Sequence, residues 1–342
     1  VVPPDRTNDS GGLRLGAYTP ADGNSVHIYE TGLENQTYTE TTLAHEFVHT
    51  VQFRTGWAEE MWFSLPTTNS ELTYDGYQTY YLLLEGSARY VEYRYSRQFL
   101  PDRSASQPPW QGGAYENASA AVRLNLARYT LGAEYVAEEI DSPAGVESLY
   151  DDPPVSTEQI LHHSDDAIEP LSVSHYDSGN WTVTEESTMG ELFLRVALRT
   201  ELNRSEAADA ASGWGNDQRV SYERGNATGT AWVLRWDDAA NASEFENSFR
   251  RYLDEKATRR AGIWYGDDVN ATYRLQRPSD RYVVVYLGNE SLVRSGSATV
   301  PSDVPSNPSV TVTVGNASAT SPETTARRIV SLSKTFRRSR LG

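Results

Sequence analysis

Two histidines and a glutamate with metal-binding spacing lie near the start of the chain. His45, Glu46 and His49 form the pattern His-Glu-x-x-His. On a helix, residues four apart project from one face, so both imidazoles can bind one metal ion while Glu46 points toward its open position. The chain has only six histidines, and chance would give this pattern in well under about one such chain in a hundred. The spacing indicates a zinc hydrolase; the alternative, two solvated histidines on a surface helix, leaves it unexplained.

An amphipathic helix is expected to position this motif. Thr37 and Glu40 form a candidate capping box, and Gly56 is a candidate stop just beyond Arg54. At 100° per residue, the core face of this helix is expected to comprise Leu43, Ala44, Phe47, Val48 and Val51. The two histidines would then border the core.

A third metal ligand is expected from a second helix. Glu85 follows Leu82-Leu83-Leu84 and precedes Gly86-Ser87-Ala88. A carboxylate after three leucines is carried toward the interior, where a positive charge must compensate it, and the small residues would let this helix approach the first one closely. Glu59, Glu60 and Glu71 are weaker rivals because their surroundings are polar. An interfacial Glu85 on an ordinary amphipathic helix is the alternative.

These two segments resemble the gluzincin metallopeptidases, in which a glutamate on a following helix completes His-Glu-x-x-His. The segment Leu84–Tyr93 is similar to the Glu-Gly-x-Ala-x-Tyr-x-Glu segment of gluzincin aminopeptidases. The interval from His49 to Glu85 is 36 residues (85 − 49), against roughly twenty in thermolysin-like and aminopeptidase members. The resemblance implies a gluzincin-like fold of the α+β class, with a small antiparallel sheet flanking the active-site helix and a mainly helical region after it.

A poorly characterised branch of secreted bacterial and haloarchaeal metallopeptidases is more similar still. Its pattern has a glutamine three residues after the second histidine, here Gln52, and a Ser-Thr-Glu-Gln-x-Leu-His-Pro stretch, here Ser156–His162 with His163 in place of the proline. This likeness extends loosely over about residues 13 to 290.

The mechanism implied by the motif uses zinc held by His45, His49 and Glu85, with Glu46 as general base for a metal-activated water. A Tyr or His must also stabilise the oxyanion. Among twenty-one tyrosines and six histidines, His162 is the first candidate, with Tyr93 and His175 behind it, although a structural role remains open for each. Glu92 is expected either to orient a zinc-bound imidazole or to pair with Arg89 or Arg94.

Composition indicates a salt-adapted protein. The formal net charge is −17, and of thirty basic residues only Lys256 and Lys334 are lysines. Acidic, lysine-poor and arginine-retaining chains are typical of proteins from halophilic archaea, since carboxylates hold hydrated cations. This charge argues against nucleic acid or an anionic membrane as partner.

Export is also expected. Ten of sixteen asparagines lie in Asn-x-Ser/Thr sequons, where chance would give about three, so they are interpreted as glycosylation acceptors on an extracellular or cell-surface protein: Asn8, Asn35, Asn117, Asn180, Asn203, Asn226, Asn241, Asn270, Asn289 and Asn316. The chain has no cysteine, hence no disulfides. It shows no signal peptide or long apolar run and begins at Val1, which suggests a processed form or a fragment.

The expected organisation is a catalytic region over residues 1–295 and a Pro/Ser-rich linker with a basic tail over 296–342. Its expected strands are Leu13–Tyr18, Ser25–Tyr29, Thr230–Trp236, Arg281–Leu287 and a Val/Thr alternation ending at Val314. Its further expected helices are Ala114–Ile140, Ser187–Leu202 and Ser243–Ala257, the last with a Ser243/Glu246 capping box. The six basic residues after Glu323 would either dock on an acidic surface or remain solvated.

The leading hypothesis is a secreted zinc peptidase that acts on peptides or proteins. One alternative is a glycosylated cell-surface or S-layer-associated protein that keeps a peptidase-derived fold for binding or structure. Another is a zinc hydrolase of non-peptide substrates, since the metal chemistry is shared. The sequence does not distinguish endopeptidase from aminopeptidase action, and it does not define the oligomeric state.

Overall fold

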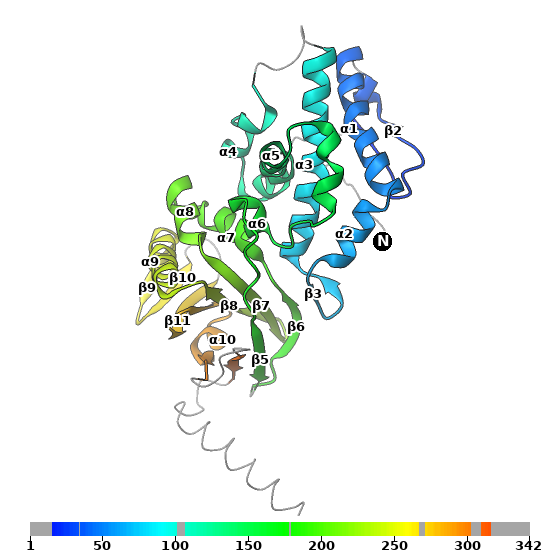
Figure 1. Cartoon of the computed structure of the whole chain (residues 1–342). Coiled ribbons are helices and arrows are strands. Elements are labelled where there is room, and N and C mark those ends of the chain that lie inside the picture. The colour runs from blue at the N-terminus through cyan, green and yellow to red at the C-terminus, as the bar shows by residue number, and fades with distance from the viewer. Residues whose placement is uncertain are drawn as a thin grey trace, which may run out of the picture.

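The protein is represented by a computed structural model that describes residues 16–33, 35–100, 107–177, 179–266, 271–301 and 309–315. Helices dominate the first half of the described chain and antiparallel strands the second (Figure 1). Because the two kinds of element are segregated along the chain, the fold class is α+β, as the sequence predicts.

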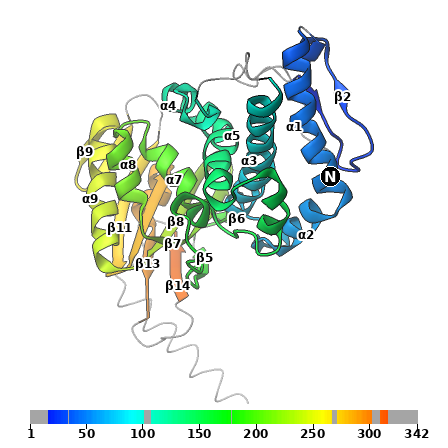
Figure 2. The same ribbon diagram turned by 45° about the horizontal axis from the view of Figure 1, so that its top comes forward.

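The helical half is built around one long central helix, α3, which lies between α1 and α5 (Figure 2). Its helices are α1 (Gln36–Arg54), α2 (Trp57–Ser64), α3 (Tyr74–Phe99), α4 (Ala114–Asn117), α5 (Ala120–Glu139) and α6 (Thr157–His162), with 3-10 turns η1 (Glu30–Leu33), η2 (Pro109–Gln111), η3 (Pro143–Gly145) and η4 (Glu147–Tyr150). A hairpin of β3 (Thr67–Thr68) and β4 (Glu71–Leu72) precedes α3. The single helix expected over Ala114–Ile140 is two helices, because Ala118 and Ser119 take extended backbone conformations.

A small antiparallel sheet lies beside α1, as expected. It consists of β1 (Ala17–Tyr18) and β2 (His27–Ile28), which are shorter than the strands predicted from the sequence. The predicted residues before Gly16 lie outside the described part of the chain. This segment contacts α1 through Thr19, whose hydroxyl donates to the backbone oxygen of Glu46.

The second half contains a seven-stranded antiparallel sheet that was not predicted from the sequence. In spatial order its strands are β6 (Thr182–Ser187), β7 (Trp214–Arg224), β8 (Ala227–Trp236), β12 (Tyr282–Gly288), β11 (Thr272–Ser279), β10 (Ile263–Gly266) and β9 (Ala257–Arg260). Of these, only β8 and β12 correspond to predicted strands, and they are hydrogen-bonded neighbours. The expectation of a mainly helical remainder therefore holds as far as α6 and is wrong beyond it.

The central strands β8 and β12 of this sheet are buried on both faces. Alternate residues of β12 face opposite sides, so Val283 and Val285 pack on the side of α7 (Gly190–Leu198), α8 (Arg204–Ala211) and α9 (Ala239–Lys256). Val284 and Tyr286 pack on the opposite side, toward α10 (Glu290–Ser295) and a three-stranded sheet of β13 (Ser297–Thr299), β14 (Ser309–Val314) and β5 (Ser172–Asp177). A strand buried on both faces loses the alternation of apolar and polar residues that marks a half-exposed one.

The described part of the expected C-terminal linker belongs to the folded body. Its Val/Thr alternation forms β14, and the strand inserts Val310, Val312 and Val314 into the core. β14 pairs in parallel with β5, more than a hundred residues earlier. Residues 302–308 and the basic tail over 316–342 lie outside the described residues.

Two predicted helix boundaries are corrected. The helix expected over Ser187–Leu202 is α7, shorter at both ends. The last predicted helix, α9, begins earlier than Ser243, because the side chain of Asp238 accepts hydrogen bonds from the amides of Ala240 and Asn241 and acts as its N-cap. The hydroxyl of Ser243 instead donates to the backbone oxygen of Ala239 within the helix. Among the described helices, none is long and apolar enough to cross a membrane.

Candidate metal centre

The His-Glu-x-x-His motif lies in the middle of α1, as predicted. The N-cap of the helix is Asn35, two residues before the expected N-cap Thr37, because the side chain of Asn35 accepts a hydrogen bond from the amide of Tyr38. After its last residue, Gly56 adopts φ 86° and starts α2, so the predicted stop is correct.

The buried face of α1 is not the one that hydrophobicity predicts. Phe47 is 56% exposed and Val51 45% exposed, whereas Glu46, His49 and Gln52 are buried. The helix is held by hydrogen bonds from its polar face to neighbouring elements, and these long-range partners do not appear in a local apolar pattern. The motif thus lies in the interior rather than beside it.

Glu85 reaches the same place from α3. The three leucines before it are buried, and so is the segment Gly86–Ala88 after it. Its predicted rivals Glu59, Glu60 and Glu71 are exposed, on α2 and β4. Gly86 serves a different contact from the expected one: a Cβ on it would lie 2.4 Å from the backbone of Gly132, so this glycine lets α3 pack on α5 rather than on α1.

Three ligand atoms converge. The Nε2 atoms of His45 and His49 lie 3.2 Å apart, and Oε2 of Glu85 lies 3.3 Å from the first and 3.4 Å from the second. In a tetrahedral site the distance between ligand atoms is about 1.6 times the metal–ligand bond, so these edges correspond to bonds of about 2.0–2.1 Å. That value fits nitrogen and oxygen ligands of zinc. Within the described chain these three residues are the one group with metal-ligand geometry.

The other nitrogen of each imidazole meets an acceptor. Nδ1 of His49 lies 2.7 Å from Oε1 of Gln52, whose amide in turn donates to the backbone oxygen of Leu84 and the hydroxyl of Tyr150. Nδ1 of His45 lies 3.3 Å from Oε2 of Glu92. With Nδ1–H donating to these acceptors, both rings present a lone pair on Nε2 toward the shared point. Glu92 thus contacts the imidazole of His45 and also pairs with Arg89, while Arg94 binds elsewhere.

The electrostatics of the group favour a cation. Burial alone would lower the pKa of His45, but hydrogen bonds to Glu85 and Glu92 outweigh it and raise the pKa to about 10. Burial alone would raise the pKa of Glu85, yet the charge of His49 and hydrogen bonds from both imidazoles hold it well below its usual range. Without a metal the site therefore retains a proton between its ligands, where a metal cation would bind.

Glu46 and a tyrosine flank the three ligands. Glu46 as a residue is 6% exposed, and its carboxylate accepts a hydrogen bond of 2.8 Å from the hydroxyl of Thr19. Tyr129, on α5, has its ring centroid 6.2 Å from that of His45. Burial raises the pKa of Tyr129 well above its ordinary value, and the charge of Glu85 together with a hydrogen bond to it adds to the shift. A neutral hydroxyl thus lies next to the ligand group.

The structure does not bring His162 to this group. Its ring, on α6, lies 2.9 Å from Glu191 and 3.3 Å from Arg195, both on α7. Of the other two candidates, Tyr93 packs against Trp110, and His175 lies on β5 near Glu186. Tyr129 was missed because nothing in its local sequence separates it from the other tyrosines. Its position shows only once α5 is packed against α3.

A comparison with protein families gives one match. A domain of unknown function, DUF8575, matches residues 181–295, which span the chain from the start of the seven-stranded sheet to α10. The metal-centre residues on α1 and α3 lie outside the matched region. Comparisons with curated proteins and with solved structures give no match.

Proposed function

We propose that this protein is a zinc-dependent peptidase of the gluzincin type. The observation that carries the proposal is the triangle formed by His45, His49 and Glu85, whose edges of 3.2–3.4 Å fit one tetrahedral zinc ion. Both imidazoles are oriented from behind by acceptors, as in catalytic zinc sites. Glu46, next to the first ligand and not itself one of the three, is available for proton transfer.

The residues around the site have distinct roles in this proposal. Bound zinc would supply a polarised water and a Lewis acid for the peptide carbonyl. Glu46 accepts the proton of the water and then delivers it to the leaving amine. The hydroxyl of Thr19 holds the Glu46 carboxylate in one orientation. The Tyr129 hydroxyl, kept neutral by its environment, can donate a hydrogen bond to the oxyanion, and it replaces His162 as our candidate for this role.

Export, glycosylation and adaptation to high salt belong to the same proposal. Five sequon asparagines are exposed in the described chain, at Asn35, Asn117, Asn180, Asn203 and Asn226, while Asn241 is half-buried and donates to the backbone oxygen of Ser212. Exposure is what an acceptor requires. The alternative is a cell-surface or S-layer-associated protein that retains the fold without the activity.

Zinc analysis combined with a peptide-library digest at high salt tests the function. We expect about one zinc per chain and cleavage by the parent protein. Glu46→Gln should keep the zinc, because Glu46 is not a ligand, and should lose activity by about a thousandfold or more.

The outcomes distinguish a zinc peptidase from a cell-surface protein without peptidase activity. Equal cleavage by Glu46→Gln and the parent protein would refute the mechanism. A parent protein that binds zinc and cleaves no peptide would favour the cell-surface role. A parent protein that binds no zinc would remove both the gluzincin assignment and the hydrolase alternatives.

A further inference from the structure

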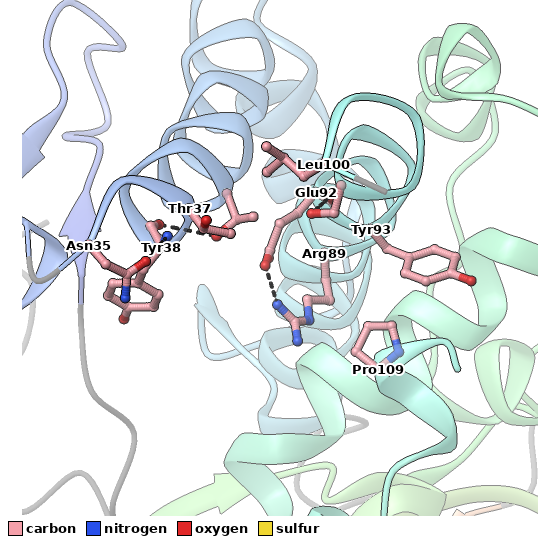
Figure 3. A pocket seen from close by; sticks show the side chains of 10 residues that line it. Asn35, Thr37, Tyr38, Arg89, Glu92, Tyr93, Leu100 and Pro109 are labelled. Carbon is pink, nitrogen blue, oxygen red and sulfur yellow. Dashed lines mark hydrogen bonds and ion pairs between the residues drawn. The ribbon is translucent and has the colours of Figure 1, made fainter. Parts of the chain in front are cut away.

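A cavity of about 350 Å³ lies beside the metal centre. It is bounded by the first turns of α1, by the second half of α3 and by Pro109 of η2 (Figure 3). Aromatic and apolar side chains, Tyr38, Tyr93 and Leu100 among them, form much of its wall. Arg89 extends from α3 into this space, and its guanidinium is joined to Glu92.

The cavity begins one helical turn from the proposed zinc position. On α1, Thr41 lines the cavity and precedes the ligand His45 by four residues, and on α3, Arg89 follows the ligand Glu85 by four. Four residues of helix span about 6 Å, whereas one residue of an extended peptide spans about 3.5 Å. A peptide held at the metal would therefore place a residue one or two positions from the scissile bond in this cavity.

Two features of the cavity favour an anion. Arg89 uses Nη1 for its ion pair with Glu92, and a guanidinium has four further N–H donors in a planar fork that fits a carboxylate. The cavity also contains the N-terminal end of α1, a helix of 19 residues, and the partial positive charge of a helix N-terminus attracts anions.

Glu92, the one acidic residue in the wall, is compensated. Its Oε1 accepts from Arg89 and its Oε2 lies against Nδ1 of His45. Both oxygens are thus directed at positive or hydrogen-bonding partners, so the residue bridges the cavity to the metal centre without leaving an uncompensated charge. Because Arg89 and Glu92 form a neutral pair, what Arg89 offers a ligand is the set of N–H donors that this pair does not use.

We infer that this cavity is a substrate subsite that takes a carboxylate, with Arg89 as the residue that determines the preference. The carboxylate belongs either to an acidic side chain or to the free C-terminus of a peptide, and both present the same planar anion. This inference rests on the proposed function, since the substrate must be held at the zinc.

Peptide binding to the zinc-loaded Glu46→Gln variant tests the inference without turnover. The probes are fluorescent hexapeptides with blocked ends that carry glutamate or glutamine at each position in turn, and a second set in which a free C-terminus replaces the amide. Fluorescence anisotropy at one fixed salt concentration gives the affinities. We expect one position, or the free C-terminus, to bind about tenfold more tightly in its charged form.

Adding Arg89→Gln should abolish this difference in affinity. It should do so even if a changed orientation of His45 weakens the binding of both the charged peptide and its neutral counterpart. Arg94→Gln is the matched control, because Arg94 lies on the same helix but binds the Tyr90 hydroxyl and the backbone oxygen of Asp141. It should keep the full preference.

Equal binding of charged and neutral probes by the Glu46→Gln variant that retains Arg89 would overturn the inference. A preference that survives the added Arg89→Gln substitution would overturn it as well. The outcome is separable from that of the proposed function. A peptidase without a charge preference refutes the subsite alone, whereas charge-selective binding by a protein whose parent form never hydrolyses peptides supports the subsite and refutes the peptidase.

Discussion

Two groups of carboxylates lie at two different levels of α3, and their pKa values are shifted in opposite directions. From the middle of α3 onward, the metal-centre carboxylates Glu85 and Glu92 both have pKa values lowered from the ordinary one. At the start of α3, about 15 Å away along its axis, the junction carboxylates lie where the helical half meets the sheet: Asp75, Glu158 and Asp217. Their pKa values are raised, to about 7 for Asp75 and about 9 for Glu158.

Burial does not explain the difference, because it raises the pKa in both groups. The neighbours do. Imidazoles and Arg89 face the metal-centre carboxylates, whereas Glu158 faces the charges of Glu191, Asp237, Asp166 and Asp75. For Asp217 burial outweighs its neighbours, because the hydrogen bonds that it accepts from two backbone amides and from the indoles of Trp214 and Trp232 all lower its pKa. A cluster of buried acids therefore indicates a metal site only where nitrogen ligands complete it.

The comparison gives its largest expected effect at Glu85. Glu85→Gln replaces a charged ligand with a neutral one and should weaken zinc binding by at least about a hundredfold. Competition with a chromogenic chelator measures the affinity. Glu158→Gln is the control, since it makes the same substitution at a buried glutamate outside the group of three ligands and should leave zinc affinity unchanged. Equal zinc affinity in the two variants would show that Glu85 is not a ligand.

A smaller effect is expected at Glu92, which contacts the ligand His45 and is not itself one of the three ligands. Glu92→Gln keeps an acceptor near Nδ1 of His45 but removes the negative charge, so zinc affinity should fall by about ten- to a hundredfold. The same chelator competition measures it. Arg94→Gln, on the same helix, should change nothing. An unchanged affinity in Glu92→Gln would mean that the glutamate only pairs with Arg89.

The three candidate ligands that the structure brings together could be predicted from the sequence because their information is local. The spacing of His45 and His49 fixes their common face, and the leucines before Glu85 fix its burial. The identity of Tyr129 could not be predicted, since its place depends on the packing of α5. The face of α1 was predicted wrongly for the same reason: Gln52 is buried by hydrogen bonds to Leu84 and Tyr150, which lie 32 and 98 residues away.

The second half of the chain was even harder to predict from the sequence, because its sheets join strands by long-range pairing. β12 is apolar on both faces and was recognisable as a strand, but only its neighbour β11 is close in the sequence, whereas β8 lies on the other side of α9 along the chain. β5 and β14 pair across more than a hundred residues, and no local pattern encodes that register. The positions of the junction carboxylates, which come from α3, α6 and β7, depend on this packing as well.

The smallest expected effect is on the free energy of unfolding. Its pH dependence should differ between the junction carboxylates and the metal-centre carboxylates. The pKa of Glu158 is raised from 4.5 to about 9 by burial and by nearby negative charges. Below pH 4.5 the residue is protonated in both the folded and the unfolded chain, so it has no pH-dependent cost there. As pH rises above 4.5 the unfolded chain loses the proton while the folded one retains it, and stability falls up to about pH 9. Glu158→Gln imitates the protonated form and should raise the free energy of unfolding at pH 8 by about 1 kcal/mol.

Urea denaturation at pH 8 and pH 4, at one salt concentration and with zinc saturating, measures this change. The gain should vanish at pH 4, where the parent residue is already neutral. Glu85→Gln should show no such gain at pH 8, because its parent carboxylate is stabilised as an anion. A Glu158→Gln variant that is less stable than the parent at pH 8 would mean that this carboxylate, too, is held ionised by a cation. The distinction between the two groups would then be lost.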